Sequence, residues 1–452
     1  MNLGLVSTLR MTFRLAYRLA VVAVLTSAAC RSTGSGAANG VATAQIPDSV
    51  QIRRDIEILA SEKFEGRRTG TPGNDSAAAY LAGRYAALRL SAAPDAANSC
   101  GTGCAASYIR RFVATEPVRG GPPSQLPTQN VVGIIPGTDP ALKNEYVVIG
   151  AHFDHLGRST VGALDPDHGS EIRNGADDNA SGSAAVLALA RRFMRSPAKR
   201  PILVAHFSGE EEGLLGSAYL VEHPPVPVKQ MVAMLNFDMV GRLRDDRVIV
   251  YGLGTASEME SVLTDANATV GLKISMVPDG TGPSDHSSFY LKDMPVLHFF
   301  TDVHPDYHRA SDDADKINFA GEVRVVDLAE RAARSIADRA TKLTFTKVAV
   351  STVARSASAG NGAYFGSIPD MGGGDDTGMR LSGVSPGGPA EKAGLMAGDL
   401  IVEFAGKPVK NIYDYTDAIG AQKPGDAITV VVLRGAKKER LSIIVTLSRR
   451  GG

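Results

Sequence analysis

Acidic and imidazole side chains recur in this chain at the points where short apolar runs end. One run, "YVVIGA", leads into "HFDH" (152–155), and another, "ILVAHF", leads into three adjacent glutamates at 210–212. Ligands bind outside the carboxyl ends of strands in open parallel sheets, so we expect these side chains to meet at one rim. The candidates are His152, Asp154, Asp177, Asp178, Glu210, Glu211, Asp238 and His308.

Two histidines among several carboxylates indicate a divalent metal site, most often for zinc. One tetrahedral zinc needs no more than three carboxylates, whereas two ions about 3.5–4 Å apart would share a bridging one. A short aspartate in the Gly- and Asn-rich loop "NGADDNASG" (174–182) suits the bridging position. The residue types therefore predict a two-metal hydrolase.

Neighbouring residues of these motifs have different expected tasks. His152 and Asp154 point to the same face of a strand, so Asp154 can hold the ring nitrogen of His152 that does not bind metal. Adjacent glutamates in irregular backbone can point different ways, so one can bind metal while the other acts as general base. Glu212 is expected to be solvated or to cap the helix that follows.

The elements that must position these residues indicate an α/β domain. From about 129 to 345, short apolar runs alternate with longer helical segments such as "SAAVLALARRFM". Uninterrupted apolar strands between helices predict a mostly parallel sheet that is buried on both faces. We expect the catalytic domain to span residues 47–345.

The composition, and the motifs that the sequence lacks, argue against several other classes of protein. Lys+Arg and Asp+Glu are both 48, so the formal net charge is zero, which argues against a nucleic-acid binder. The chain contains no HExxH, P-loop or GxGxxG motif. It also lacks a convincing GxSxG, which disfavours a serine hydrolase.

Five motifs in this order resemble those of the co-catalytic zinc aminopeptidases, the family of the bacterial leucyl aminopeptidases and aminopeptidase Y. They are "HFDH", "NGADDNASG", "FSGEEEGLLGS", "NFDMVG" and "DYHRASDD", and the resemblance covers roughly residues 48–345. It implies a three-layer αβα zinc-exopeptidase fold with two zinc ions. Cobalt or manganese could occupy the same ligands.

The resemblance also implies a ligand set. The implied ligands are His152 and Asp238 for one zinc, Glu211 and His308 for the other, and Asp177 as the bridge. The family's peptide bond between its two aspartates, here Asp177–Asp178, is typically cis. His304 competes with His308 in the same segment, but "YHRASD" matches the family's His-x-x-x-Asp pattern and favours His308.

Further roles follow from the same resemblance. Glu210 would be the general base, and Asp154 would be the partner of His152. Asp285 and His286, in "SDHSSF", recur in the family near the substrate site. His155 is expected to be structural.

The last part of the chain, residues 362–450, resembles bacterial PDZ domains through "GGPAEKAGLMAGDLIVEFAGKPV". By that resemblance "YFGSIPDM" (364–371), with Tyr364, Phe365 and Gly366, would line a peptide groove. PDZ domains accept an extended peptide as an added strand. A packing module that only orients the peptidase is an equal alternative. A small polar linker, 346–361, would separate the two domains.

The amino terminus predicts export. Three arginines precede "LAVVAVL" (19–25), so residues 1–29 read as a signal peptide and 30–46 as a flexible tether. Cleavage before Cys30 would permit lipidation, although ordinary signal cleavage also fits "SAA" (27–29). We favour a periplasmic or outer-envelope protein, lipid-anchored at Cys30. Cys100 and Cys104 would form a disulfide there.

These observations together predict an exported zinc aminopeptidase that acts on peptides. A carboxypeptidase for acidic C-termini, a single-zinc glutaminyl cyclase and a catalytically silent scaffold remain as alternatives on the same fold. The scaffold is disfavoured because every ligand position is filled, and the cyclase because a two-metal set is present. The sequence predicts no nucleic-acid partner, and it predicts membrane contact only through the lipid.

Overall fold

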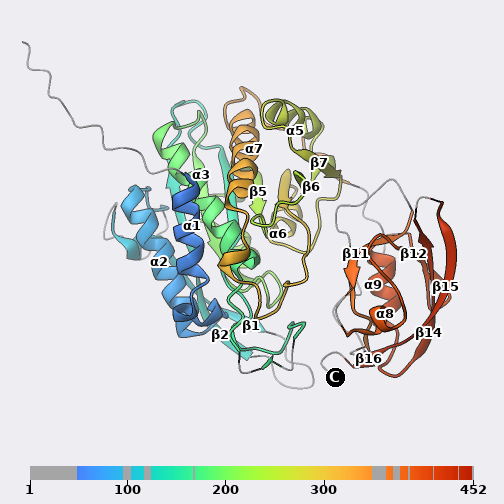
Figure 1. Ribbon diagram of the computed structural model, residues 1–452. Coiled ribbons are helices and arrows are strands. Elements are labelled where there is room, and N and C mark those ends of the chain that lie inside the picture. The colour runs from blue at the N-terminus through green and yellow to red at the C-terminus, as the bar shows by residue number, and fades with distance from the viewer. Residues whose placement is uncertain are drawn as a thin grey trace, which may run out of the picture. The chain divides into compact units, whose positions relative to one another are not determined.

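The computed structural model describes residues 48–94, 103–116, 124–165, 168–169, 171–348, 363–369, 377–384, 387–410, 412–435 and 437–449. They form an α/β domain up to residue 348 and a β-rich domain from residue 363 (Figure 1). The predicted signal peptide and tether, Cys30, Cys100 and most of the predicted linker lie outside the described residues.

Eight strands form the central sheet of the α/β domain, in the order β1-β2-β4-β3-β5-β8-β6-β7. The middle strands β4, β3, β5 and β8 run parallel, while β2 and β6 join them antiparallel on either side. The strands are β1 (Ile109–Glu116), β2 (Ser124–Ile135), β3 (Tyr146–His152), β4 (Ile202–Phe207), β5 (Met231–Phe237), β6 (Arg247–Tyr251), β7 (Lys273–Val277) and β8 (Val296–Phe300).

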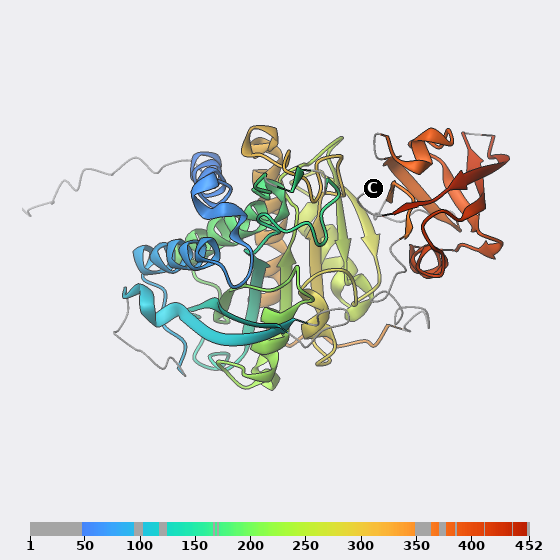
Figure 2. The ribbon, with the colours of Figure 1, turned by 90° about the horizontal axis from the view of Figure 1, so that it is seen from below.

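Helices cover both faces of this sheet, because alternate side chains of each strand point to opposite sides. On β3, Val147 and Ile149 pack into one apolar core and Val148 packs into the other. The first face is covered by α1 (Asp48–Leu59), α2 (Pro72–Leu88), α3 (Gly182–Arg195), α5 (Met259–Asn267) and α7 (Phe319–Ala337) (Figures 1 and 2). The second face is covered by α4 (Leu215–Glu222) and α6 (His286–Tyr290). The predicted three-layer fold with a mostly parallel sheet is confirmed.

Short helical turns connect these elements and carry part of the site. They are η1 (Glu62–Arg67), η2 (Ala105–Tyr108), η4 (Ala176–Ser181), η5 (Val228–Gln230), η6 (Leu253–Thr255) and η7 (Ala314–Lys316). Thr71 caps α2 by accepting a hydrogen bond from the Asn74 N–H. Pro72 suits the first position of the helix because it has no backbone N–H that would be left unpaired there. The segment just before α2, 67–69, contacts the strand ends through its own side chains, since Arg67 donates to Phe153 O and the Thr69 hydroxyl donates to the Asp154 carboxylate.

The β-rich domain has its own apolar core and its own sheet. Its strands are β9 (Ala363–Tyr364), β10 (Ser367–Pro369), β11 (Met379–Val384), β12 (Leu400–Phe404), β13 (Lys407–Pro408), β14 (Ala427–Arg434), β15 (Glu439–Thr446) and β16 (Ser448–Arg449). The main order is β10-β11-β12-β14-β15, with α8 (Pro389–Lys392) and α9 (Ile412–Gly420) packed around it. In this order β10 is an edge strand.

The start of the predicted linker is still part of the α/β domain. The Thr346 N–H donates to Thr255 O, and the Val348 N–H donates to the Tyr290 hydroxyl.

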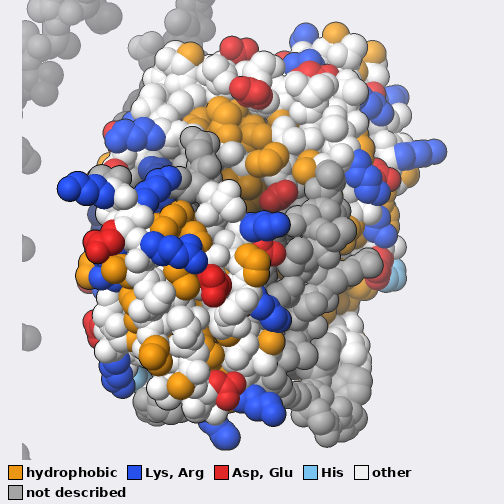
Figure 3. Space-filling model, turned by 90° about the vertical axis from the view of Figure 1, so that its right-hand side faces the viewer, with side chains coloured by type: hydrophobic (Ala, Val, Ile, Leu, Met, Phe, Trp, Pro, Cys, Tyr) orange, Lys and Arg blue, Asp and Glu red, His pale blue; other side chains and the backbone are white. Residues whose placement is uncertain are grey.

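The described residues contain no helix with the length and hydropathy that crossing a membrane requires. On the face drawn in Figure 3, the described basic and acidic side chains are interspersed.

Candidate metal centre

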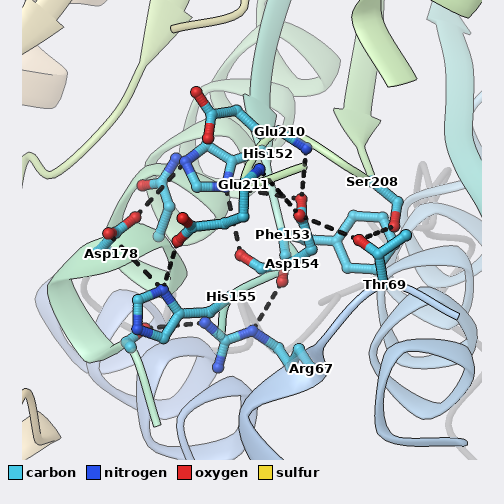
Figure 4. A network of polar contacts seen from close by, with 12 residues as sticks. Arg67, Thr69, His152, Phe153, Asp154, His155, Asp178, Ser208, Glu210 and Glu211 are labelled. Atoms are coloured by element: carbon cyan, nitrogen blue, oxygen red, sulfur yellow. Dashed lines mark hydrogen bonds and ion pairs between the residues drawn. The ribbon is translucent and has the colours of Figure 1, made fainter. Parts of the chain in front are cut away.

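The ends of neighbouring parallel strands bring the predicted site residues together. β3 ends at His152, β4 ends three residues before Glu210, and β5 ends one residue before Asp238. Because β3 pairs in parallel with both β4 and β5, all three carboxyl ends lie at the same edge of the sheet. Figure 4 shows the resulting network of polar side chains.

One group of potential ligands surrounds His152. Its Nε2 lies 3.3 Å from Asp238 Oδ1 and 3.5 Å from Asp178 Oδ1. His152, Glu210 and Asp238 each offer one ligand atom, and these atoms lie within 4.8 Å of one another. A metal ion could therefore bind within this group.

A second group surrounds Glu211. Its Oε1 lies 2.8 Å from His155 Nδ1, and its Oε2 lies 3.3 Å from His308 Nε2. His155, Asp178 and Glu211 offer ligand atoms within 4.8 Å of one another. The sequence suggested a structural role for His155, yet the structure places it directly in this group. His308 also belongs here, with Nε2 3.2 Å from Asp178 Oδ2 and Nδ1 3.0 Å from Gly162 O.

Asp178 lies between the two groups, and Asp177 does not. The carboxylate of Asp178 faces His152 through Oδ1 and His308 through Oδ2. Asp177 turns away, because its Oδ1 accepts the Gly241 N–H and its Oδ2 lies 3.2 Å from His304 Nε2. The sequence predicted Asp177 as the bridging residue, but the next residue, Asp178, is the one that lies between the two groups. The cis peptide bond is also one residue later than predicted, since it joins Asp178 to Asn179.

Asp154 positions the glutamate loop as well as His152. The Nδ1 of His152 lies 3.2 Å from the Asp154 carbonyl oxygen and 3.7 Å from its carboxylate. The same carboxylate accepts the backbone N–H groups of Glu210 and Glu211, each at 3.3 Å, and the Thr69 hydroxyl at 3.1 Å. The predicted contact with His152 is thus accompanied by a second one that the sequence did not suggest.

The three adjacent glutamates point in different directions. In Figure 4 the Glu211 carboxylate points toward His155, and the Glu210 carboxylate lies beside the His152 ring. Glu212 is not solvated as expected, because its side chain is only 6% exposed and pairs with Arg68 at 3.7 Å. Burial raises the pKa of Glu212 to about 8, and the nearby Asp154 charge adds to this effect.

The two glutamates at the centre differ in proton affinity. Burial raises the pKa of Glu210 well above its ordinary value, with the charges of Asp238 and Glu211 acting in the same direction against His152. Burial alone would also raise the pKa of Glu211, but His308 and His155 hold it well below its usual value. Glu211 is therefore suited to stay ionised, and Glu210 to accept a proton.

The polar atoms of the site fit divalent ions. Two of them are buried and have no hydrogen-bond partner among the described residues, namely His152 Nε2 and Asp238 Oδ1. Buried polar atoms are normally paired, and unpaired buried charges are costly. Imidazole nitrogens and carboxylate oxygens that converge in this way are the donors that zinc, cobalt and manganese accept.

The two residues predicted near the substrate site are both fully buried. Burial raises the pKa of Asp285 to about 7; the His152 charge opposes this shift, and the carboxylates of Asp154 and Asp238 reinforce it. His286 stacks on the ring of His298, with centroids 4.5 Å apart, and burial lowers its pKa well below the ordinary value. In this structure His286 is a packing residue, whereas Asp285 belongs to the electrostatic surroundings of the centre.

Two residues that contact the centre were missed from the sequence. Arg67 is fully buried and donates to four backbone carbonyls, including Phe153 O at 2.7 Å and Gly175 O at 2.8 Å. Tyr307 stacks on the His308 ring at 3.8 Å between centroids. Burial, and the charges of nearby site carboxylates, raise the pKa of Tyr307 well above its usual value. The only signal for Tyr307 was its position next to His308.

The predicted groove residues of the second domain have separate roles. Tyr364 pairs with Ser448 between two short strands, and Gly366 adopts a left-handed conformation with φ 81°. Phe365 is 1% exposed and packs on Phe404 with ring centroids 5.1 Å apart, so its side chain supports the core instead of lining a groove.

In the α/β domain, Cys104 is disulfide-bonded, while its predicted partner Cys100 lies outside the described residues.

Comparison with known proteins identifies both domains. Residues 130–333 match the model of peptidase family M28, and residues 368–445 match that of the PDZ domain. Leupeptin-inactivating enzyme 1 of Streptomyces exfoliatus is 31% identical over 191 residues, 41% of this chain and 38% of that protein. Aminopeptidase YwaD of Bacillus subtilis is 27% identical over 202 residues, 42% of this chain and 41% of that protein. The chain thus spans less than half the length of these two relatives.

Solved structures share the fold of the α/β domain. A zinc aminopeptidase from Bacillus subtilis superposes with a TM-score of 0.50 and 18% identity, covering 68% of this chain and 97% of that one. A Bacteroides thetaiotaomicron glutaminyl cyclase bound to N-acetylhistamine gives 0.51 and 17%, covering 64% and 99%. At these identities the likeness shows the fold alone. The matches to family models, and not these superpositions, assign residues 130–333 to a peptidase family M28 domain and residues 368–445 to a PDZ domain.

Proposed function

We propose that this chain is a metal-dependent aminopeptidase that removes residues from the free amino end of peptides. The observation that carries the proposal is the position of Asp178, whose two carboxylate oxygens face two separate groups of potential metal ligands. A carboxylate in that position can be shared by two ions about 3.5–4 Å apart. Asp178 takes the bridging role that the sequence assigned to Asp177.

The remaining ligands follow from the two groups. His152 and Asp238 would hold one ion, while Glu211 and His308 would hold the other, with His155 as a further donor on that side. Two divalent ions, zinc by resemblance to the co-catalytic aminopeptidases, would polarise the scissile carbonyl and lower the pKa of a water molecule.

Glu210 is the proposed general base. It lies beside the His152 group, and its raised pKa suits a residue that takes a proton and later returns it. Glu210 would take a proton from the attacking water and deliver it to the nitrogen of the leaving amine. The phenol of Tyr307, held by stacking on His308, would donate a hydrogen bond to the oxygen on which negative charge develops.

The balance of charge favours an amino-terminal substrate over a carboxyl-terminal one. A free ammonium would meet an environment rich in buried carboxylates, including Asp285. A substrate carboxylate would need a cation, but Arg67 is saturated by backbone carbonyls and Arg242 pairs with two aspartates. Glutaminyl cyclase activity is the second candidate, because a cyclase shares this fold.

A panel of aminoacyl anilides and N-acetylated controls tests this function. We expect the full chain to cleave only substrates with a free amine, to lose activity with a chelator and to regain it with zinc. Cleavage of acetylated substrates from their carboxyl end would refute the aminopeptidase. Formation of pyroglutamate from N-terminal glutamine, without hydrolysis, would establish the cyclase instead.

Replacing Glu210 with Gln tests the general base. The change keeps the size of the side chain but removes its proton affinity, so we expect kcat to fall by about 10²–10⁴-fold while metal content stays unchanged. Glu222→Gln, at the exposed end of α4, is the matched control and should keep normal kcat. A near-normal rate in Glu210→Gln would show that another group takes the proton.

We also propose export to the periplasm or outer envelope, with lipidation at Cys30, on the basis of the amino-terminal sequence alone. Cell fractionation of the wild type and of Cys30→Ala tests this, and equal membrane retention of both would refute the anchor.

The PDZ domain is proposed to bind peptides at the free edge of β10. Titration with a peptide library would show this directly, and no binding by any peptide would favour a packing role.

A further inference from the structure

One buried carboxylate, that of Asp312, touches two of the loops that carry the proposed metal ligands and belongs to a third. Its Oδ2 accepts the backbone N–H groups of Asp177 at 2.9 Å and of Asp178 at 3.1 Å. Its Oδ1 lies 3.3 Å from Arg242 Nη2, and Arg242 follows Asp238 by four residues. Asp312 itself follows His308 by four residues.

The geometry of these contacts determines where the Asp178 carboxylate points. Two consecutive backbone N–H groups held by one oxygen restrict the peptide planes on both sides of Asp177, and the Ala176 N–H donates to the Asp312 carbonyl oxygen at 3.0 Å. Hydrogen bonds to a charged acceptor are about twice as strong as neutral ones. The segment that presents Asp178 to both ligand groups is therefore attached to the His308 loop at three points.

Asp177 reinforces this attachment from the opposite side. Its Oδ1 accepts the Gly241 N–H at 2.7 Å, which ties the same segment to the loop after Asp238. Arg242 continues the chain of contacts, because its Nη2 also lies 2.9 Å from Asp306 Oδ2. The loops that carry Asp178, Asp238 and His308 are thus braced together without using any of those three side chains.

We infer that Asp312 is a positioning residue that holds the Asp178, Asp238 and His308 loops in the one arrangement that binds two metal ions with high affinity. This inference rests on the proposed two-metal function. Asp312 is not proposed as a ligand, since both of its oxygens are already engaged and the residue is fully buried. Its effect on the metals is exerted through backbone geometry.

Replacing Asp312 with Asn is a specific test, because the amide has the same shape but only one acceptor oxygen. If that oxygen receives the two backbone N–H groups, the amide NH₂ faces the guanidinium of Arg242; if the amide flips, the NH₂ faces the two N–H groups. Either orientation sets donor against donor, so the brace is broken while the volume of the side chain is kept. Asp315→Asn is the matched control, since it removes an equal charge from an exposed position three residues later.

The measurement is zinc affinity of the full chain by competition with a chromophoric chelator, together with the unfolding temperature of the metal-free protein. We expect wild type and Asp315→Asn to bind two equivalents with equal affinity. Asp312→Asn should bind both equivalents about 10–100-fold more weakly, as changes to residues that orient metal ligands generally do. At saturating zinc, the kcat of Asp312→Asn should lie closer to the wild-type kcat than its zinc affinity lies to the wild-type affinity.

The possible outcomes separate this inference from the proposed function. A lower unfolding temperature of metal-free Asp312→Asn with unchanged zinc affinity would mean a purely structural role and would overturn the inference alone. Failure of the wild type to bind zinc would overturn the proposed function and the inference with it. If Asp312→Asn does not fold, Arg242→Gln releases the other oxygen of Asp312, and unchanged zinc affinity in that variant would refute the brace.

Discussion

Arg67 offers a test of how the site is built, because its guanidinium joins two ligand-bearing segments. Nε donates to Phe153 O at 2.7 Å, Nη1 to Leu59 O and Asn174 O at 2.6 Å, and Nη2 to Gly175 O at 2.8 Å. Burial lowers the pKa of Arg67 to about 10, and site carboxylates oppose that shift, so the group remains charged at neutral pH.

The structure gives a magnitude for Arg67→Lys. A single ammonium can reach one or two of these carbonyls, which leaves at least two buried and unpaired. Each unpaired buried acceptor costs about 1–3 kcal/mol, so we expect the free energy of unfolding to fall by about 4 kcal/mol. That loss is large beside the ordinary effect of a point mutation, which is about 1 kcal/mol.

Urea unfolding of the metal-free protein, followed by far-UV circular dichroism, measures this loss. The chain contains no tryptophan, so fluorescence would report the transition poorly. Arg68→Lys is the matched control, because Arg68 is 28% exposed and its pair with Glu212 spans 3.7 Å. We expect the control to lose less than about 1 kcal/mol.

The result that would refute the reasoning is an Arg67→Lys variant as stable as Arg68→Lys. It would mean that the four carbonyls find water or other donors, and that the segments after β3 and before η4 are held by their own packing. A stable variant with weakened zinc affinity would instead show that Arg67 acts on the arrangement of the ligands alone.

Two further predictions address the catalytic phenol and the pH dependence of stability. Tyr307→Phe should lower kcat by about tenfold, which corresponds to the loss of one hydrogen bond, with unchanged zinc content. Tyr219→Phe on α4 is the control, and equal kcat values in both variants would show that Tyr307 has no part in the mechanism. Burial lowers the pKa of His206 to about 4, and its ring contacts the Tyr85 hydroxyl at 2.7 Å. Because the folded pKa lies below the unfolded value of about 6.5, His206 should contribute full stability above pH 6.5 and lose about 3 kcal/mol as the pH falls to about 4. Urea midpoints of the metal-free protein should therefore fall more steeply over this range in the wild type than in His206→Gln, and parallel pH profiles would contradict the assignment.

The sequence alone predicted the architecture and which residues would meet at one edge of the sheet, because both depend on local patterns. Uninterrupted apolar runs separated by helical segments require a sheet covered on both faces, and parallel strands place their carboxyl ends at one edge. Residues that follow those ends, such as His152, Glu211 and Asp238, therefore had to converge whatever the loops did. The division of Glu210 and Glu211 between two directions also followed from irregular backbone after a strand.

Choices between adjacent or similar residues required the tertiary structure. Asp177 and Asp178 have the same side chain, and which one faces the ligands depends on Asp312 and Gly241, which are distant in sequence. Glu212 is buried because Arg68 comes from a segment far earlier in the chain. The sequence determined which chemical groups reach this edge of the sheet. Long-range hydrogen bonds decided which of those groups face one another, because the direction of a side chain in a loop is set by the backbone contacts of its neighbours.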